Sequence, residues 1–223
     1  MGLIDSVVID GVDSYDEYEA SVKERVIEMP KKKSIRETVP YSNMVYDFSE
    51  IDGELYWDNR TIQYVFEILA DSPEALEDKK QPFIAWLMNV QEKEIHDPYI
   101  TDYYFLGTFD TISVDDSEIE KSTITVTFSC YPYKISKAKK MFKFSITADE
   151  IEKRIFQNSC HQITPTFRCD VPCHVVIGDK SYDLVAGDTT DNSIKIDSGI
   201  NTVKMRSKGG DGTLCIEFYE EIF

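Results

Sequence analysis

The chain has 223 residues, of which 42% are hydrophobic and 12% aromatic, enough apolar material for one large or two small globular domains and too much for a disordered chain. Its net charge of −17 at pH 7 opposes the phosphate neutralisation on which nucleic-acid binding depends, so we expect no sequence-specific nucleic-acid partner. Acidic residues outnumber basic ones by 28 to 15 in residues 1–140 and by 13 to 9 in residues 141–223. Such an excess suits either solubility or a channel through which DNA slides, and composition does not separate the two.

The first residues, Met1 to Ser6, contain neither the basic nor the apolar region of a secretory signal, and the chain has no run of about 18 apolar residues. We therefore expect neither secretion nor insertion into a membrane. An odd number of cysteines without a signal favours reduced thiols in the cytosol. The five cysteines are Cys130, Cys160, Cys169, Cys173 and Cys215.

The first part of the chain predicts two strands after a segment without a clear pattern. Residues 13–40 are poorly patterned for the core of a monomer, and Lys31–Lys33 are typical of a solvated loop or of a guarded edge strand. Apolar and polar residues then alternate over residues 44–48 and 61–68, which predicts strands, with a turn at Asp52–Gly53 between them.

A helix is expected to begin after Ser72, a good capping residue that precedes Pro73 and Glu74. We expect this helix to end near Lys80, because Pro82 should break or kink it, and residues 83–88 to continue as a buried turn or two.

The middle of the chain predicts two further strands. The first covers residues 103–109, and an acidic turn at Asp115–Asp116 leads to the second, over residues 123–131. The second has a strict alternation of apolar and hydroxyl-bearing residues, which is typical of a half-buried antiparallel strand. Pro132 should end it, because proline has no backbone N–H to donate.

The last third predicts short elements. Thr147–Glu150 has the form of a capping box and predicts a short helix around residues 151–155. Residues 160–223 read as five or six strands with turns every 8–12 residues, which suggests a small β-sandwich. Gly209–Gly212 has the composition of a hairpin turn and lacks the lysine and helix of a phosphate-binding loop.

The strand that ends at Pro132 resembles the close of the N-terminal domain in distal tail proteins (Dit) of long-tailed bacteriophages and prophages. The resemblance extends over about residues 1–140 through an ordered set of short motifs, none of which is specific alone. These motifs are Trp57 with Asn59–Arg60, Ser72–Pro73–Glu74, Trp86–Leu87, Asp97–Pro98–Tyr99, Tyr103–Gly107, and Thr125-x-Thr127-Phe128-x-Cys130-x-Pro132-Tyr133-Lys134.

A weaker resemblance covers the C-terminal part, where Gly199-x-Asn201-x-Val203 and a final alternating strand are similar to the galectin-like domain of the same proteins. The two resemblances imply a mainly β fold with one or two short helices. They imply an N-terminal β-sandwich with a helix and a hairpin over residues 1–140, which would form a ring. They also imply a small galectin-like β-sandwich over residues 141–223.

The family resemblance implies a structural role rather than an enzyme. Six copies would form a hexameric ring, single or stacked, which joins the tail tube to the tail tip or baseplate and lets the DNA pass. Partners would be the tail tube protein, a tail-tip or tail-associated protein, and a receptor-binding protein. The protein would lie at the virion tail tip after assembly in the host cytoplasm, in a phage or a prophage.

A metal site is the sharpest alternative chemistry, since Cys160, His161, Cys169, Cys173 and His174 lie within fifteen residues. Their spacings differ from those of zinc knuckles, so structural thiols are favoured, and a Cys169–Cys173 disulfide is disfavoured in reducing cytosol. The stretch Asp188–Asn192 lacks the spacing of a calcium loop and predicts a polar loop with Asx turns.

No nucleophile elbow or metalloprotease motif is present, so the sequence predicts no catalytic, cofactor-binding or metal-binding residue, and no cofactor. The alternative function is a carbohydrate-binding module that recognises host cell-wall polysaccharide. It would need exposed aromatic residues with polar partners, for which the candidates are Trp57, Trp86, Tyr182 and Tyr219, with the two tryptophans favoured as core residues.

Overall fold

A computed structural model describes residues 5–38, 40–41, 43–49 and 55–223, and the turn expected at Asp52–Gly53 lies outside this part. The described chain forms many antiparallel strands and two helices, so the prediction of a mainly β fold is confirmed. Its contacts divide it into an N-terminal unit, Met1–Lys134 with Phe223, and a C-terminal unit, Ile135–Ile222. None of the described helices is long and apolar enough to cross a membrane.

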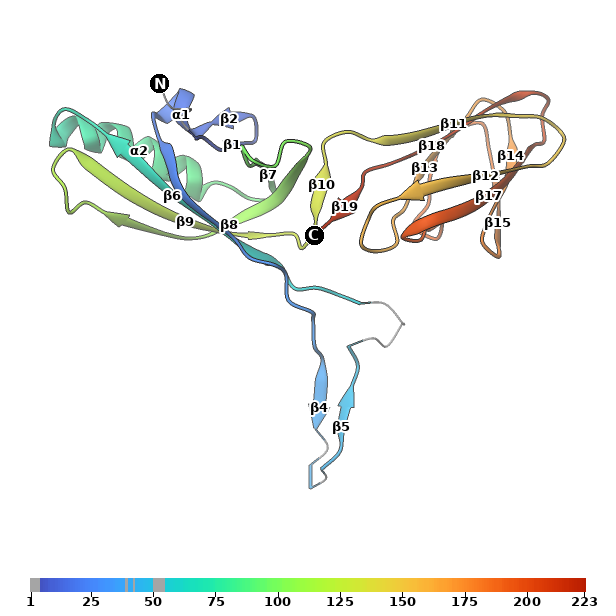
Figure 1. The fold of residues 1–223 in the computed structure, drawn as a ribbon, viewed down its shortest axis with the longest axis horizontal. Helices are drawn as coiled ribbons and strands as arrows, with labels where there is room; N and C mark the ends of the chain where they lie inside the picture. Colours follow the sequence, from blue (N-terminus) through green and yellow to red (C-terminus); the bar gives the residue numbers. More distant parts are fainter. Residues whose placement is uncertain (1–4, 39, 42, 50–54) are drawn as a thin grey trace. The chain divides into compact units, whose positions relative to one another are not determined.

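The N-terminal unit is built on one antiparallel sheet (Figure 1). Both predicted strands at its centre are confirmed, and they pair over ten residues each, from Arg60↔Cys130 to Leu69↔Lys121. The strands follow one another across the sheet in the order β2 (Val12–Asp13), β1 (Val8–Ile9), β7 (Lys93–His96), β8 (Tyr103–Asp115), β9 (Lys121–Cys130), β6 (Arg60–Leu69) and β3 (Ser21–Ile27).

Alternation along β6 and β9 separates a buried face of the sheet from a polar one. Every second residue of each strand is fully buried, as the period of two requires. The buried face packs against α2 (Pro73–Met88), whose Phe83 and Leu87 are also fully buried. The core residues from the two strands are Ile62, Tyr64, Phe66, Ile68, Ile124, Val126 and Phe128.

The helix α2 begins as predicted but does not break at Pro82. The Ser72 hydroxyl accepts a hydrogen bond from the Ala75 amide at 3.2 Å, and Pro73 occupies the first helical position. The helix then continues through Pro82 to Met88, so the expected end near Lys80 was wrong. Pro82 lies on the exposed side of α2, where water can satisfy the carbonyl that loses its backbone donor. The second helix, α1 (Ser14–Tyr18), lies in a segment for which no helix was predicted.

The C-terminal unit is a β-sandwich of two four-stranded antiparallel sheets around one core. The strand order in the first sheet is β11 (Lys140–Ile146), β18 (Gly212–Phe218), β13 (Thr166–Cys169), β16 (Gly187–Thr190). In the second sheet it is β12 (Ile151–Gln157), β17 (Gly199–Ser207), β14 (Cys173–Ile177), β15 (Lys180–Leu184). Two further short strands, β10 (Lys134–Ser136) and β19 (Glu221–Ile222), pair with each other.

Two local predictions in this unit were wrong. The segment expected to be a helix around residues 151–155 is strand β12, because its seven residues all pair with β17, and Ile155 and Gln157 alternate into the core. The glycine-rich turn at Gly209–Gly212 does not close a hairpin, since β17 and β18 belong to different sheets.

A substitution at Gly212 should destabilise the sandwich, because a Cβ atom there would collide with the side chains of Asp170 and Val171, which lie in the connection between β13 and β14. We expect Gly212→Ala to lower the free energy of unfolding of the C-terminal unit by about 1–3 kcal/mol, as overpacking does. Urea unfolding measures the change, with Lys180→Ala at an exposed position as the control. Equal stability of the two variants would contradict the collision.

Candidate assembly surface

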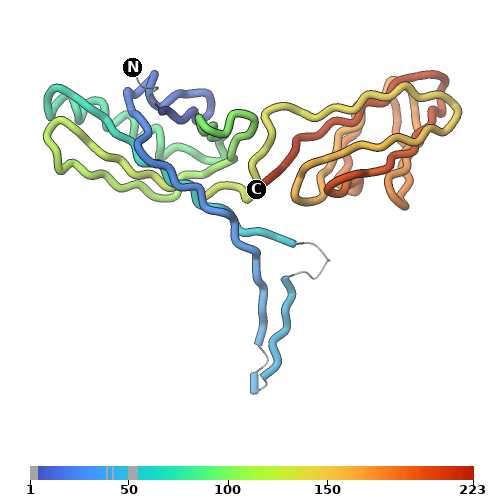
Figure 2. The backbone as a smooth tube through the Cα atoms, viewed as in Figure 1, coloured from blue at the N-terminus to red at the C-terminus, as the bar shows by residue number. Residues whose placement is uncertain are grey.

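A long two-stranded ribbon leaves the sheet at the end of β3 and returns to it at the start of β6 (Figures 1 and 2). We call its described residues, within 28–59, the arm. Backbone hydrogen bonds join its two sides along its length: the Asp58 amide donates to the Lys31 carbonyl at 2.9 Å and the Phe48 amide to the Ile35 carbonyl at 2.8 Å. Farther out the sides form β4 (Arg36–Thr38) and β5 (Val45–Asp47), which pair with each other.

The arm exposes its apolar side chains. The predicted strand at residues 44–48 is confirmed as β5, yet all three residues of β5 are exposed. Two strands alone cannot enclose a core, and an isolated hairpin is marginally stable in water. An exposed apolar surface of this extent marks a contact with another molecule. The apolar residues exposed by 39% or more are Met29, Ile35, Tyr41, Met44, Val45, Tyr46, Phe48, Leu55 and Tyr56.

Polar groups, rather than apolar packing, fix the conformation of the arm. The Ser49 hydroxyl accepts a hydrogen bond from the Ile35 amide at 2.9 Å, and the Asp47 carboxylate accepts one from the Ser49 amide at 2.9 Å. Hydrogen bonds from Ser49, and then from Arg36, lower the pKa of Asp47 to about 2. The rings of Tyr46 and Phe48 stack at 6.2 Å, which leaves an aromatic pair on the surface.

A buried charge holds the strands at the base of the arm. The Asp97 side chain is completely buried and accepts hydrogen bonds from the Arg25 guanidinium, from the Tyr64 hydroxyl at 3.0 Å and from the Tyr99 amide at 2.9 Å. Burial, and then the Asp97 carboxylate, raise the pKa of Tyr64 well above its usual value. Because Arg25 lies on β3 and Tyr64 on β6, this cluster ties both strands that lead into the arm to the segment that follows β7.

The strands β3 and β8 are the candidates for pairing with another chain. In the described sheet β3 is the last strand on one side, and β7 pairs with only Phe105–Gly107 of β8, a strand that β10 also contacts as a partner. Each of these two strands also contains a register shift, between Val22 and Glu24 in β3 and between Phe109 and Thr111 in β8. Open edges present unpaired backbone groups to other chains.

The face of the sheet opposite α2 is polar but carries few charges. The half-buried residues of β6 and β9 point to this face, and most bear a hydroxyl or amide group. They provide almost no cation that could bind a phosphate. The residues are Thr61, Gln63, Val65, Glu67, Lys121, Thr123, Thr125, Thr127 and Ser129.

The five residues considered for zinc are separated in the sandwich. Cys169 and Cys173 lie in its core, Cys160 is exposed, and the His174 ring hydrogen-bonds Asp183 at 2.6 Å on the surface. His161 lies elsewhere, between the Gln162 carbonyl oxygen at 2.7 Å and the Glu221 carboxylate at 2.8 Å. No group of three or more His, Cys, Asp and Glu side chains suited to a metal ion occurs among the described residues.

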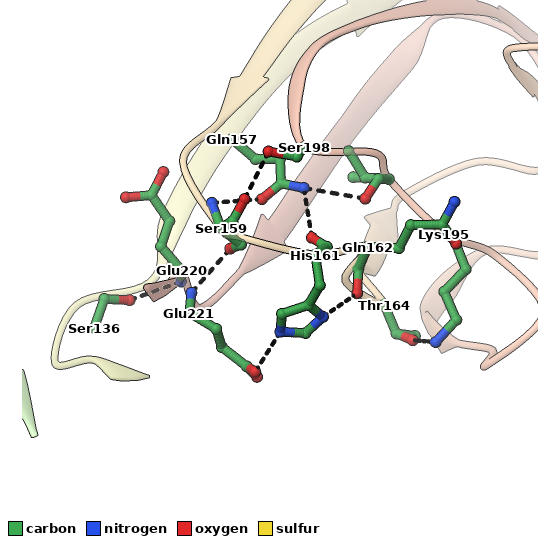
Figure 3. Close-up of polar contacts among 11 residues, drawn as sticks. Ser136, Gln157, Ser159, His161, Gln162, Thr164, Lys195, Ser198, Glu220 and Glu221 are labelled. Atoms are coloured by element: carbon green, nitrogen blue, oxygen red, sulfur yellow. Dashed lines mark hydrogen bonds and ion pairs between the residues drawn. The ribbon is translucent and has the colours of Figure 1, made fainter. Parts of the chain in front are cut away.

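His161 belongs instead to a polar cluster that holds the end of the C-terminal unit (Figure 3). The Glu220 amide donates a hydrogen bond to the Ser136 hydroxyl at 2.9 Å, and the Glu221 amide donates one to the Ser159 hydroxyl at 2.9 Å. The fully buried Gln157 donates to the carbonyls of His161 and Ile196 and accepts from the Ser159 amide at 2.8 Å. The cluster therefore holds the strand end at Glu221, and its polar groups serve as hydrogen-bond partners for one another.

The other candidate ligand residues have ordinary partners. Asp191 accepts a hydrogen bond from the Ser193 amide at 2.8 Å, the predicted Asx turn. The loop predicted over Asp188–Asn192 was wrong for its first three residues, which belong to β16 and pair with β13, and Asp188 pairs with Arg168. The Trp86 ring stacks on Tyr18 at 5.0 Å within the N-terminal core, and the Trp57 ring meets Phe223 edge to face at 4.7 Å.

The two C-terminal tyrosines considered for sugar binding are on different parts of the sandwich. Tyr182 lies on β15 of the second sheet and packs partly against the core, whereas Tyr219 follows β18 of the first sheet, with the Lys139 ammonium group 5.5 Å from its ring centre. These two residues therefore do not form one row of aromatic rings.

Sequence reasoning missed β3 and α1 and did not recognise the arm as a ribbon. The register shift between Val22 and Glu24 interrupts the alternation by which β3 could have been found. A signal for α1 was present in Asp13, whose carboxylate accepts hydrogen bonds from the amides of Tyr15 at 2.7 Å and Asp16 at 3.1 Å.

Removal of the buried carboxylate should cost more stability than removal of one of its donors. We expect Asp97→Ala to lower the free energy of unfolding by about 3–5 kcal/mol, because it leaves Arg25 and the Tyr64 hydroxyl without their acceptor in a buried site. Tyr64→Phe deletes one neutral donor and should cost about 1 kcal/mol. Urea unfolding of both variants tests the order, and an Asp97→Ala variant as stable as Tyr64→Phe would contradict it.

No family model matches the chain, and no curated protein sequence matches it. Among solved structures, the crystal structure of the Dit protein of phage SPP1, titled as a paradigm of the hub adsorption apparatus in phages that infect Gram-positive bacteria, matches with a TM-score of 0.72 and 14% identity, over 99% of this chain and 100% of that chain. A baseplate structure of phage P2 matches with a TM-score of 0.41 and 9% identity, over 96% of this chain and 98% of that chain. The chain has the fold of a phage distal tail protein.

Proposed function

We propose that the protein is a structural component of a phage tail, a hub in which six copies form a ring between the tail tube and the tail tip or baseplate. The observation that carries this proposal is the similarity of fold to SPP1 Dit over both units and nearly the whole length of each chain. The ring, its copy number and the passage of DNA come from the family resemblance, and features of this chain support them.

The strand directions of the sheet suit a closed ring. The strands β8, β9, β6 and β3 are successive antiparallel neighbours, so β8 and β3 run in opposite directions. If the β3 edge of one copy pairs with the β8 edge of the next, the antiparallel alternation continues across the boundary. This contact joins two different surfaces of the chain, as a ring of identical copies requires.

The arm supplies a second contact in the ring, in which it packs on the neighbouring copy. Nine apolar side chains of the arm are exposed, and their burial against a neighbouring copy would remove apolar surface from water. Its basic residues Lys31–Lys33 and Arg36 also complement a neighbour whose net charge is −17.

The polar face of the sheet lines the channel in this arrangement, with α2 on the outside. Hydroxyl and amide groups bind water and offer DNA few cations, so the phosphates release no counterions on contact. The DNA can therefore pass along this face without a strong attraction. The acidic residues of the unit would oppose adhesion further.

The C-terminal domain, residues 141–223, would carry the contacts to receptor-binding or other accessory proteins. The N-terminal domain, residues 1–140, would carry those to the tail tube protein and the tail-tip protein. The protein would assemble in the host cytoplasm and remain in the virion tail. The role is non-enzymatic.

Replacement of the aromatic pair of the arm should prevent ring assembly. We expect Tyr46→Ser with Phe48→Ser to weaken the association of copies at least about 100-fold, because exposed aromatic anchors of this kind often provide about 2 kcal/mol each or more. Light scattering and negative-stain images compare the variant with the unchanged protein. If the unchanged protein needs a tail partner to form rings, rescue of tail assembly in a phage that lacks the protein gives the same comparison.

The matched control is Phe156→Ser with Ile200→Ser, which changes two facing residues of the C-terminal sandwich that are 45% and 69% exposed. This variant should assemble as the unchanged protein does. The arm variant should keep its melting temperature, since neither side chain belongs to the core. Rings formed equally well by the arm variant would refute the proposed role of the arm.

Positive charge on the polar face should slow the release of DNA. We expect Thr125→Arg with Thr127→Arg to give assembled particles whose DNA leaves more slowly at low salt than at high salt, because each arginine attracts phosphate. The control Thr125→Gln with Thr127→Gln adds similar bulk without charge. Equal ejection kinetics for the two variants would show that this face does not line the channel.

A further inference from the structure

Two thiols meet inside the C-terminal sandwich at the point where the chain crosses from one sheet to the other. Cys169 is the last residue of β13 in the first sheet, and Cys173 is the first residue of β14 in the second. Their residues are 3% and 0% exposed, both belong to the core of the sandwich, and the two thiols lie near enough for each to influence the pKa of the other. The Cys169 sulfur also lies 2.9 Å from the Val185 carbonyl oxygen, to which it donates.

The remaining cysteines have other surroundings. Cys130 is in the core of the N-terminal unit, Cys160 is exposed, and the Cys215 thiol lies against the Glu217 carboxylate at 3.6 Å. Because β18 alternates, Cys215 projects away from the core that contains Leu214 and Ile216. The pair Cys169 and Cys173 therefore differs from these three in having a second thiol nearby.

We propose that Cys169 and Cys173 are an oxidation site, at which an intramolecular disulfide forms between the two sheets when the protein meets a small-molecule disulfide oxidant. One cysteine thiolate attacks the oxidant, its S–S bond breaks, and one thiol of the oxidant leaves. The second cysteine thiolate then attacks the resulting mixed disulfide and releases the second thiol. Two protons and two electrons pass from the protein to the oxidant, which becomes two thiols.

The surroundings of the pair predict a slow reaction that accelerates with pH. Burial raises the pKa of Cys169, and burial and then Cys169 raise the pKa of Cys173 to about 12, so few thiolates exist at neutral pH. The thiolate is the reacting form. As long as the pH is below the pKa, the thiolate population grows about tenfold for each unit by which the pH rises. The pair therefore remains reduced during folding in a reducing compartment and oxidises over long exposure outside it.

The test uses the full chain with oxidised glutathione, at pH 7 and pH 9. After oxidation the protein is denatured, its free thiols are alkylated, and the masses of the tryptic peptides are measured by mass spectrometry. Cleavage after Arg168 and Lys180 gives one peptide that contains both cysteines. We expect this peptide to lose two hydrogens and both of its alkylation sites, faster at pH 9, while the exposed Cys160 forms a mixed disulfide with glutathione.

The controls separate this pair from adventitious oxidation. Cys160→Ser should leave the loss of two hydrogens from this peptide unchanged, and Cys173→Ser should abolish it. A peptide that keeps both of its cysteines alkylated after complete exposure, or a disulfide between Cys160 and either member of the pair, would overturn the proposal. The peptide map of the unchanged protein decides the question even if Cys173→Ser does not fold, and ring assembly plays no part in the readout.

Discussion

The antiparallel pairing of β6 with β9 is the interaction on which the rest of the N-terminal unit depends. Ten residue pairs run without interruption, and the period of two directs Tyr64, Phe66 and Phe128 to the same side. That side needs the cover of α2, and the other side is left polar. A slip of one residue would exchange the two faces, so this register alone decides both the core and the surface assigned to the channel.

The amino-acid sequence predicted the elements whose side chains alternate and failed where another part of the chain decided the structure. The strands β6 and β9 and the cap at Ser72 could be found because their signals are local. The segment 151–157 has a good helix start, yet pairing with β17 and the burial of Ile155 outweigh the cap. The arm gave a correct strand at β5, but no local pattern says that both of its faces stay exposed.

The candidate site shows the same limit. The five candidate residues Cys160, His161, Cys169, Cys173 and His174 are close in sequence. Strand alternation and the crossing between sheets nevertheless place them in four separate environments. The proposed assembly surface gave little signal beyond the poor patterning of residues 13–40, because a surface that packs on another copy can have the composition of a core. The buried Asp97 cluster was equally hidden, since Arg25, Tyr64 and Asp97 are far apart in sequence.

The register shifts in β3 and β8 have a consequence for the geometry of assembly. A bulge bends its strand and increases the local twist, and here one bulge lies in the edge strand β3 and the other in β8, while the β6–β9 ladder between them is unbroken. Identical copies joined by unlike edges close into a ring only when each adds the right rotation, and otherwise grow into an open helix. In the proposed ring, the curvature set by these two irregularities would thus determine whether a fixed number of copies closes the ring or the copies polymerise without end.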